Sequence, residues 1–257
     1  MKKRRCFMVL IALFVVLSGV RASDSNVYEY GEFWQKSLSM ESCFLKQPSD
    51  TTARRLLVFG DSTCDGVSRR FADYAKANGY TMYSAVWYGA TFKSWAYTTE
   101  LPRIMKEFQP TFVVISLGTN DLGYHDISAR AEAVREIMRE LGDVPFIWIG
   151  PISLKAIKKD PGIVDMLRET VGADRFYNSY DLQLSRFPDG IHPTFEASAV
   201  WIDGVVDWMN NGSSVSDLVK LEKPKTTSRQ FRHNEKHATK YRGTYKPGVA
   251  GTKKAGR

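Results

Sequence analysis

The chain has 257 residues, of which 43% are hydrophobic and 25% are charged. This composition fits one globular domain with appendages and excludes a chain of strongly biased composition. The formal net charge of +8 comes from the two ends: residues 1–22 carry five Lys/Arg and no acid, and residues 211–257 carry twelve Lys/Arg and three Asp/Glu.

The N-terminus has the pattern of a secretory signal. Residues 1–5 read MKKRR, an apolar run follows over residues 6–20, and Val20-Arg21-Ala22 precedes Ser23. A basic start, a short apolar run and a small-x-small site are typical of a cleaved signal peptide, here residues 1–22. The run is short for a membrane span. We therefore expect a secreted or periplasmic protein, with a retained N-terminal membrane anchor as the alternative.

The mature chain then keeps two cysteines, Cys43 in the N-terminal segment 23–53 and Cys64 beyond it. In an oxidising compartment such a pair can form a disulfide. A bridge closing a loop of roughly 20 residues contributes about 3 kcal/mol by loop entropy. Two unpaired thiols are the equal alternative.

From residue 54, apolar strand-like runs alternate with segments of helical spacing. The strand-like runs are residues 55–60, 80–88, 111–118, 145–150 and 174–180. The helical patterns begin near Val67, Leu101, Ala131, Ile163 and Pro193, and the last of them closes the domain near residue 210. Alternation of this kind predicts a parallel sheet with helices on both faces.

Beyond residue 210 the apolar pattern stops, and Lys, Gly, Thr and Ser dominate. Such a segment buries too little apolar surface to offset the entropy of ordering. We therefore expect four parts: a signal peptide (1–22), an N-terminal segment (23–53), a folded domain (54–210) and a basic, disordered tail (211–257).

Polar residues follow the predicted strands at their carboxyl ends, where ligands bind in parallel sheets. Ser62 comes directly after the first strand, in the stretch LLVFGDSTCDG. It is a candidate nucleophile, although Asp61 or Ser62 as a helix cap is the simpler interpretation. Nucleophilic serine needs a base and an acid that orients the base.

His192 is the best candidate for the base, because Asp189 precedes it by three residues in PDGIHPT. One short loop can then carry both acid and base. The alternatives are His125, whose neighbour Asp126 is adjacent in sequence, and a purely structural role of Asp189 and His192 at a helix start.

Three groups are candidate donors to an oxyanion: the Ser62 N–H, the Gly89 N–H and the Asn120 side-chain amide. Gly89 lies in WYGAT after the second strand, and Asn120 lies in GTND after the third. Each of the last two residues is also typical of a plain turn.

Together, Gly60-Asp61-Ser62, Gly89, Gly118-Thr119-Asn120-Asp121 and Asp189-Gly190-Ile191-His192 resemble the SGNH hydrolases, also called the GDSL esterase/lipase superfamily. The order and spacing agree over about 150 residues, although Thr63 stands where the family usually has leucine and the Gly89 block matches loosely. The resemblance implies a flavodoxin-like, three-layer α/β/α sandwich with a five-stranded parallel sheet. It implies Ser62 as nucleophile, His192 as base, Asp189 as orienting acid, and Ser62, Gly89 and Asn120 as the oxyanion hole.

We therefore expect a serine esterase that hydrolyses acyl esters, most plausibly acetyl esters, of an extracytoplasmic carbohydrate or cell-wall glycan. Trp87, Tyr88, Trp95 and Tyr97 are candidates for stacking on a sugar ring, or for the core. The alternatives are a glycan O-acyltransferase, a lysophospholipase or lipase on the same machinery, and a non-catalytic protein that binds anionic surfaces.

No metal or cofactor is expected, because the four histidines lack metal-ligand spacing and no phosphate-binding glycine motif occurs. The expected partners are an acylated glycan or small ester and, through the basic tail, an anionic cell-surface polymer. No specific nucleic acid is expected, and the sequence leaves the oligomeric state open.

Overall fold

A computed structural model describes residues 53–157, 159–228, 230–238 and 240–249. The predicted signal peptide, most of the N-terminal segment and Cys43 lie outside these described residues. All elements below belong to one unit, which begins at Ser49.

A six-stranded sheet forms the centre of this unit, with strand order β5-β4-β3-β1-β2-β6 and every pairing parallel. The strands are β1 (Arg55–Gly60), β2 (Thr81–Trp87), β3 (Phe112–Ser116), β4 (Phe146–Ile149), β5 (Phe176–Tyr177) and β6 (Glu235–His237). The first five have the order of the flavodoxin-like fold, so the predicted α/β class and parallel sheet are confirmed. The predicted number of strands is wrong, because β6 adds a sixth.

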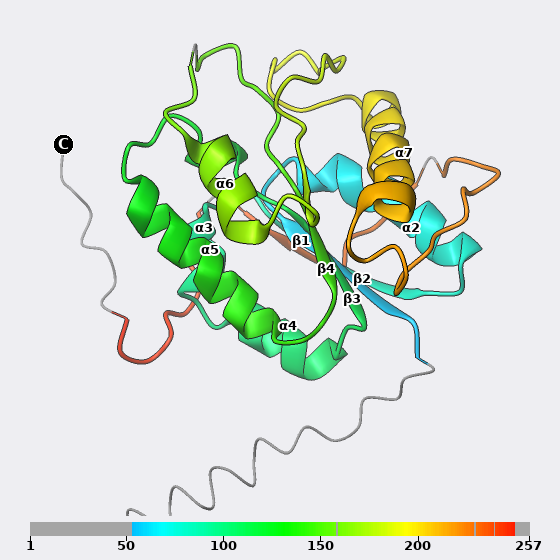
Figure 1. Ribbon diagram of the computed structural model, residues 1–257, viewed down its shortest axis with the longest axis horizontal. Coiled ribbons are helices and arrows are strands. Elements are labelled where there is room, and N and C mark those ends of the chain that lie inside the picture. The colour runs from blue at the N-terminus through cyan, green and yellow to red at the C-terminus, as the bar shows by residue number, and fades with distance from the viewer. Residues whose placement is uncertain (1–52, 158, 229, 239, 250–257) are drawn as a thin grey trace, which may run out of the picture. The chain divides into compact units, whose positions relative to one another are not determined.

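Helices cover both faces of the sheet, as Figure 1 shows. One layer contains α2 (Cys64–Ala77) and α7 (Phe195–Gly212). The other contains α3 (Phe92–Ala96), α4 (Glu100–Phe108), α5 (Ile127–Leu141) and α6 (Ile163–Val171). A 3-10 turn, η1, spans Thr119–Asp121.

The strands are apolar over nearly their whole length because both of their faces are covered. β3 is buried at all of its positions, and β1 at all but Arg55. Alternate residues enter two separate cores: Leu57 and Phe59 pack with α3–α6, and Leu56 and Val58 pack with α2 and α7. This arrangement fixes the ends of β1 and β3 side by side.

The structure differs from the expectation of a disordered tail. β6 pairs with the edge of β2, in the register Ala85↔Glu235 to Trp87↔His237. Val215, Val219 and Leu221 are buried. Composition predicts disorder because the segment has little apolar surface to bury. The edge of β2 has backbone groups without partners, and these form hydrogen bonds with the segment.

Charge complementarity also holds this segment. Lys223 pairs with Asp203 at 2.9 Å, Lys236 with Asp65 at 2.9 Å, and Lys246 with Glu136 at 2.8 Å. The carboxylates belong to α7, α2 and α5. Part of the positive charge of the tail is therefore paired with carboxylates of the domain.

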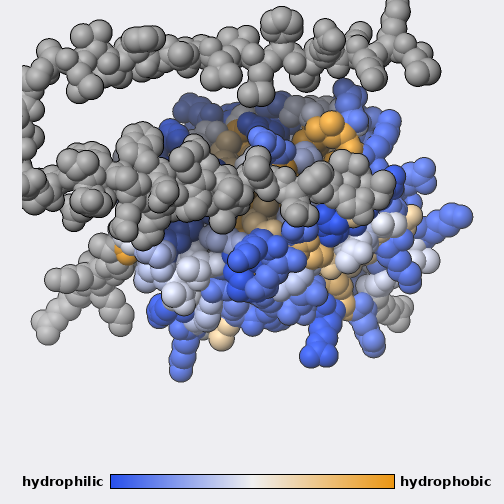
Figure 2. Space-filling view, turned by 90° about the horizontal axis from the view of Figure 1, so that it is seen from below, coloured by the Kyte–Doolittle hydropathy of each residue, from blue (hydrophilic) through white to orange (hydrophobic). Residues whose placement is uncertain are grey.

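The face drawn in Figure 2 is mainly hydrophilic where described atoms are visible, with small apolar patches between charged side chains. No helix among the described residues is both long enough and apolar enough to span a bilayer.

Candidate active site

Ser62 lies between β1 and α2, at the point where the strand order reverses between β1 and β3. Such a switch point is where open α/β sheets bind ligands, because the loops on either side separate there. The N-cap residue of α2 is Thr63, and no side-chain capping bond is formed. The Ser62 hydroxyl instead contacts an imidazole, so the capping interpretation does not describe it.

The structure brings Ser62, His192 and Asp189 together. The Ser62 Oγ lies 2.7 Å from His192 Nε2, and His192 Nδ1 lies 2.8 Å from Asp189 Oδ2. The other Asp189 oxygen, Oδ1, accepts hydrogen bonds from the backbone N–H groups of Ile191 and His192, at 2.8 and 3.0 Å. The aspartate thus fixes both the ring and the backbone of the histidine.

The hydrogen bond with His192 lowers the pKa of Asp189 to about 2, with help from the two backbone donors. Asp189 therefore stays ionised at neutral pH and favours a proton on His192 Nδ1. In that tautomer His192 Nε2 is unprotonated and can accept the hydroxyl proton of Ser62.

The loop that carries the acid and base is closed on itself. The Phe187 N–H donates to the His192 carbonyl at 2.8 Å, and the Gly190 N–H donates to the Phe187 carbonyl at 2.9 Å. Arg186 reaches from this loop to the carbonyl of Ser153, at 2.7 Å. These bonds fix the position of His192 within a loop that is otherwise exposed to solvent.

Asp61 has a structural role in the site beyond the helix cap that the sequence suggested. It is fully buried, and its Oδ1 accepts from the N–H and the hydroxyl of Thr63 at 2.9 and 2.7 Å. Its Oδ2 accepts from the N–H groups of Gly118 and Thr119, at 3.2 and 3.0 Å. Asp61 thereby ties the nucleophile turn to the loop after β3.

Burial raises the pKa of Asp61, and the hydrogen bonds from Thr63, Thr119 and Gly118 oppose that rise. Three of its four donors are backbone N–H groups, which cannot accept a proton from a carboxylic acid. The ionised carboxylate can accept hydrogen bonds from all four donors at once, so this site favours the ionised form of Asp61. The signal was present in the sequence, since an acid directly follows an apolar buried strand.

Asn120 lies in η1, and its amide Nδ2 donates to the Ala90 carbonyl at 3.0 Å. This bond connects the loop after β3 with the Gly89 block after β2. The neighbouring Asp121 is buried, accepts from the Phe92 N–H at 3.0 Å and forms an ion pair with the buried Arg130. Asn120 and Asp121 therefore both connect the loop after β3 with the segment after β2.

Gly89 is exposed and has φ +75°, in the left-handed region that favours glycine. An added Cβ would meet no atom within 4 Å, so the backbone conformation, rather than lack of space, accounts for glycine here. The Asn120–Ala90 bond places Gly89 in a loop fastened to η1.

A pocket of about 180 Å³ opens in front of Ser62 and His192. Phe187, Phe195 and Tyr88 contribute aromatic walls. Asp65 also lines it and accepts hydrogen bonds from Tyr88 at 2.6 Å and from His233 at 3.0 Å. Side-chain hydrogen bonds, the one from His233 foremost, lower the pKa of Asp65 against the effect of burial.

Of the four aromatic residues proposed to stack on a sugar, Trp95 is ruled out. It is fully buried, and its Nε1–H donates to the Gly60 carbonyl at 3.3 Å. It therefore supports the end of β1 from the core side. Trp87, Tyr88 and Tyr97 line a second, larger cavity.

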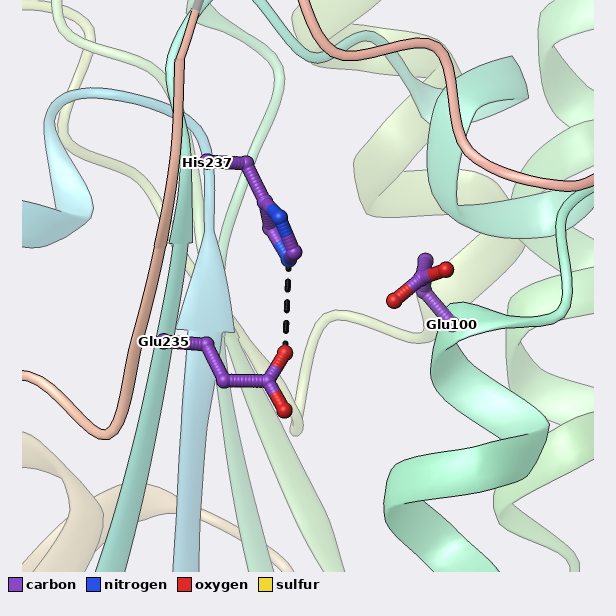
Figure 3. A group of neighbouring side chains, drawn as sticks. All are labelled: Glu100, Glu235 and His237. Atoms are coloured by element: carbon purple, nitrogen blue, oxygen red, sulfur yellow. Dashed lines mark ion pairs between the residues drawn. The ribbon is translucent and has the colours of Figure 1, made fainter.

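One cluster of potential metal ligands occurs among the described residues, namely Glu100, Glu235 and His237 (Figure 3). Their ligand atoms lie within 4.8 Å of one another. Glu235 already accepts from Arg103 and Tyr83, and Glu100 accepts from Tyr241. A guanidinium inside the cluster supplies the positive charge, so these contacts fasten β6 to α4.

Cys64 is fully buried and is a free thiol in this structure, 3.4 Å from the Ser68 hydroxyl. Burial raises its pKa, which keeps the thiol protonated. Its proposed partner, Cys43, lies outside the described residues.

No family model and no curated protein matches the chain. Solved structures do match. TesA is 19% identical, with 62% of this chain and 98% of TesA covered at a TM-score of 0.48. An acetyl esterase mutant with acetate ion is 11% identical, with 62% and 100% covered at 0.47.

A third match is the periplasmic domain of a lipopolysaccharide acetyltransferase from Salmonella ser. Paratyphi A, 16% identical, with 71% and 95% covered at a TM-score of 0.43. Identities and TM-scores this low assign no activity to the chain, so its chemistry must come from its own contacts. In motif order and in the contacts of Ser62, His192 and Asp189, the chain resembles the SGNH hydrolases.

Proposed function

We propose that this protein is a serine esterase of the SGNH type. The observation that carries the proposal is the continuous chain of contacts from Ser62 Oγ to His192 Nε2, and from His192 Nδ1 to Asp189 Oδ2, at 2.7 and 2.8 Å. A hydroxyl, a base and an orienting acid in hydrogen-bond reach are the requirements for nucleophilic catalysis by serine.

In the first step the Ser62 oxygen attacks the acyl carbon while His192 Nε2 takes the hydroxyl proton. The carbon–oxygen bond to the alcohol then breaks, and His192 returns the proton to the leaving alcohol. A water molecule next gives its proton to His192 and attacks the acyl-serine. The bond between the acyl carbon and the Ser62 oxygen then breaks, His192 gives its proton to that oxygen, and the carboxylic acid is released.

The tetrahedral intermediates carry negative charge on the former carbonyl oxygen. We assign its stabilisation to the N–H groups of Ser62 and Gly89 and to the second amide N–H of Asn120. The first amide N–H already holds the Ala90 carbonyl, so the amide is oriented before substrate binds. Preorganised donors of this kind are the largest single contribution in many acyl-transfer enzymes.

The pocket in front of Ser62 supports a short acyl group. Its volume of about 180 Å³ is below the range of roughly 300–1,000 Å³ that holds a whole small ligand. A long acyl chain would have to leave this pocket. We therefore propose acetyl esters, carried by an extracytoplasmic glycan as the signal sequence suggests.

Labelling with a fluorophosphonate probe, followed by mapping of the adduct, tests the nucleophile. We expect the adduct on Ser62, and Ser62→Ala should abolish both labelling and turnover while the melting temperature is retained. Undiminished ester hydrolysis by Ser62→Ala would refute the mechanism.

A series of 4-nitrophenyl esters tests the acyl group. We expect kcat/KM to be highest for acetate, and a maximum at eight carbons or more would reject the acetylesterase proposal. Analysis of products with a sugar acceptor present distinguishes hydrolysis from transfer, because only a transferase would acylate the added sugar.

A further inference from the structure

A second cavity, of about 530 Å³, lies beside the catalytic pocket. Tyr88 lines both, and Gly89, a proposed oxyanion donor, lines the larger one. The volume falls in the range of roughly 300–1,000 Å³ that is typical of small-molecule sites. The two cavities therefore share Tyr88 as a common wall.

Five aromatic residues contribute to the walls of the larger cavity. Trp87, Tyr88 and Tyr97 come from the segment at and after the end of β2, and Tyr241 and Tyr245 come from the C-terminal segment. Tyr245 is 42% exposed, so part of its ring is open to a ligand at this cavity. Aromatic faces offer flat apolar surfaces to the C–H face of a sugar ring.

Polar groups interrupt these rings. Thr91 and Ser94 supply hydroxyls, Lys93 and Arg242 supply positive charges, and Glu132 supplies a negative charge. Lys93 is paired with Asp126 at 2.8 Å, and Glu132 is paired with Arg139. A lining of aromatic rings and hydroxyls, whose Lys93 and Glu132 are already paired within the protein, fits a polyhydroxylated ligand better than an acyl chain.

The C-terminal segment builds one wall of this cavity. The ring of Tyr241 lies 4.9 Å from that of Trp87 and is stacked on His237 at 4.2 Å and 15°. His237 is in turn held by β6 and by its ion pair with Glu235, as Figure 3 shows. The wall is thus attached to the sheet itself.

Backbone contacts fix the position of Tyr245. The Thr99 N–H donates to the Thr244 carbonyl at 2.7 Å, and the Lys246 N–H donates to the Tyr97 carbonyl at 2.9 Å. Between the two tyrosines, Gly243 has φ +67° and passes so close to Thr98 that an added Cβ would lie 2.9 Å from its Cγ2. A wall ordered before binding avoids the entropic cost of ordering it on the ligand.

We propose that this cavity binds the carbohydrate ring that carries the ester, with the acyl group reaching Ser62 past Tyr88. The basic C-terminal segment then acts as part of the substrate site. This inference rests on the proposed esterase function and adds to it the site that binds the glycan part of the ester.

The test compares two acetyl esters on the same variants: 4-nitrophenyl acetate, whose alcohol is small, and partially O-acetylated cello-oligosaccharides. Tyr245→Ala should lower kcat/KM for the oligosaccharide by about tenfold more than for 4-nitrophenyl acetate, mainly through KM. Tyr245→Phe should restore most of this loss. Tyr80→Ala, which removes a ring at the opposite end of β2, should change neither value.

Equal losses on both substrates, or no loss on either, would overturn the inference. It is also overturned if the wild-type protein hydrolyses 4-nitrophenyl acetate but not the oligosaccharide, an outcome that leaves the esterase intact. Binding of cellotetraose to Ser62→Ala protein, measured by calorimetry, tests the cavity without turnover. Binding that Tyr245→Ala does not weaken would contradict the assignment.

Discussion

Replacement of Asp61 by asparagine tests how the site is held together. The side chain keeps its size, but one of the two acceptor oxygens becomes an NH₂ group. Either the Thr63 side or the Gly118 and Thr119 side then faces a donor, because all four partners donate to the carboxylate. With the NH₂ group on the Thr63 side, the Thr63 hydroxyl can turn to accept from it, but the Thr63 N–H loses its acceptor in a fully buried site. With the NH₂ group on the other side, the N–H groups of Gly118 and Thr119 both lose their acceptor.

The magnitude follows from the number of donors left without a partner. Each buried unsatisfied group costs about 1–3 kcal/mol, and the less costly amide orientation leaves one such group, so Asp61→Asn should destabilise the protein by about 1–3 kcal/mol. For a domain of this size the melting temperature should fall by about 3–9 °C. The nucleophile turn and the loop after β3 also lose their connection, and a displacement of about 1 Å at Ser62 costs roughly 10²-fold in rate.

Thermal unfolding by circular dichroism and the rate of fluorophosphonate labelling measure the two effects. Asp165→Asn is the matched control, because that carboxylate is 71% exposed and has one surface partner, Arg168. A melting temperature within about 2 °C of wild type, together with labelling at the wild-type rate, would show that Asp61 does not organise the site.

Four further predictions follow from the geometry. Asn120→Ala should reduce kcat by about 10²–10³-fold with little change in KM, and a pure KM effect would contradict an oxyanion role. Asp189→Asn should reduce kcat/KM by about 10³-fold, less than loss of the nucleophile does, because the asparagine favours the wrong tautomer of His192; full activity would mean that another group orients the ring. The interaction with His237, foremost, lowers the pKa of Glu235 to about 2 from its ordinary 4.5. Its stabilisation of β6 is therefore complete above pH 4.5 and lost as the pH falls toward 2. Hydrogen-exchange protection of residues 235–246, corrected for the intrinsic rate at each pH, should fall over that window, and an equal fall in Glu235→Gln would assign the effect elsewhere. Truncation of residues 231–257 should lower the melting temperature, since it uncovers the edge of β2, and an unchanged value would mean that this strand adds no stability.

The sequence by itself determined the class of fold and the order of the chemical groups. Continuous apolar runs such as residues 56–59 are readable because both faces of a parallel sheet are covered. The same runs place Ser62, Gly89 and Asn120 directly after successive strands, and parallel strands necessarily end at one edge. Asp189 and His192 were recognisable as a pair because three residues separate them on one short loop.

Only the tertiary structure decided what those groups contact. The distance of 2.7 Å between Ser62 and His192 joins residues 130 positions apart, and no local pattern encodes it. The four donors to Asp61 come from two different loops, which are far apart along the chain. Trp95 reads like the other aromatic residues near it, yet it is buried against β1 because α3 turns it inward.

The C-terminal segment is the clearest case of a structure that its own sequence pattern does not predict. Its few apolar residues indicate disorder when burial alone is counted, because composition reports what a segment can bury by itself. Its order depends on partners that the rest of the fold supplies: the open edge of β2 and the carboxylates of α2, α5 and α7. Backbone pairing to an edge and charge pairing across a fold are properties of two surfaces, so they exist only once both surfaces have formed.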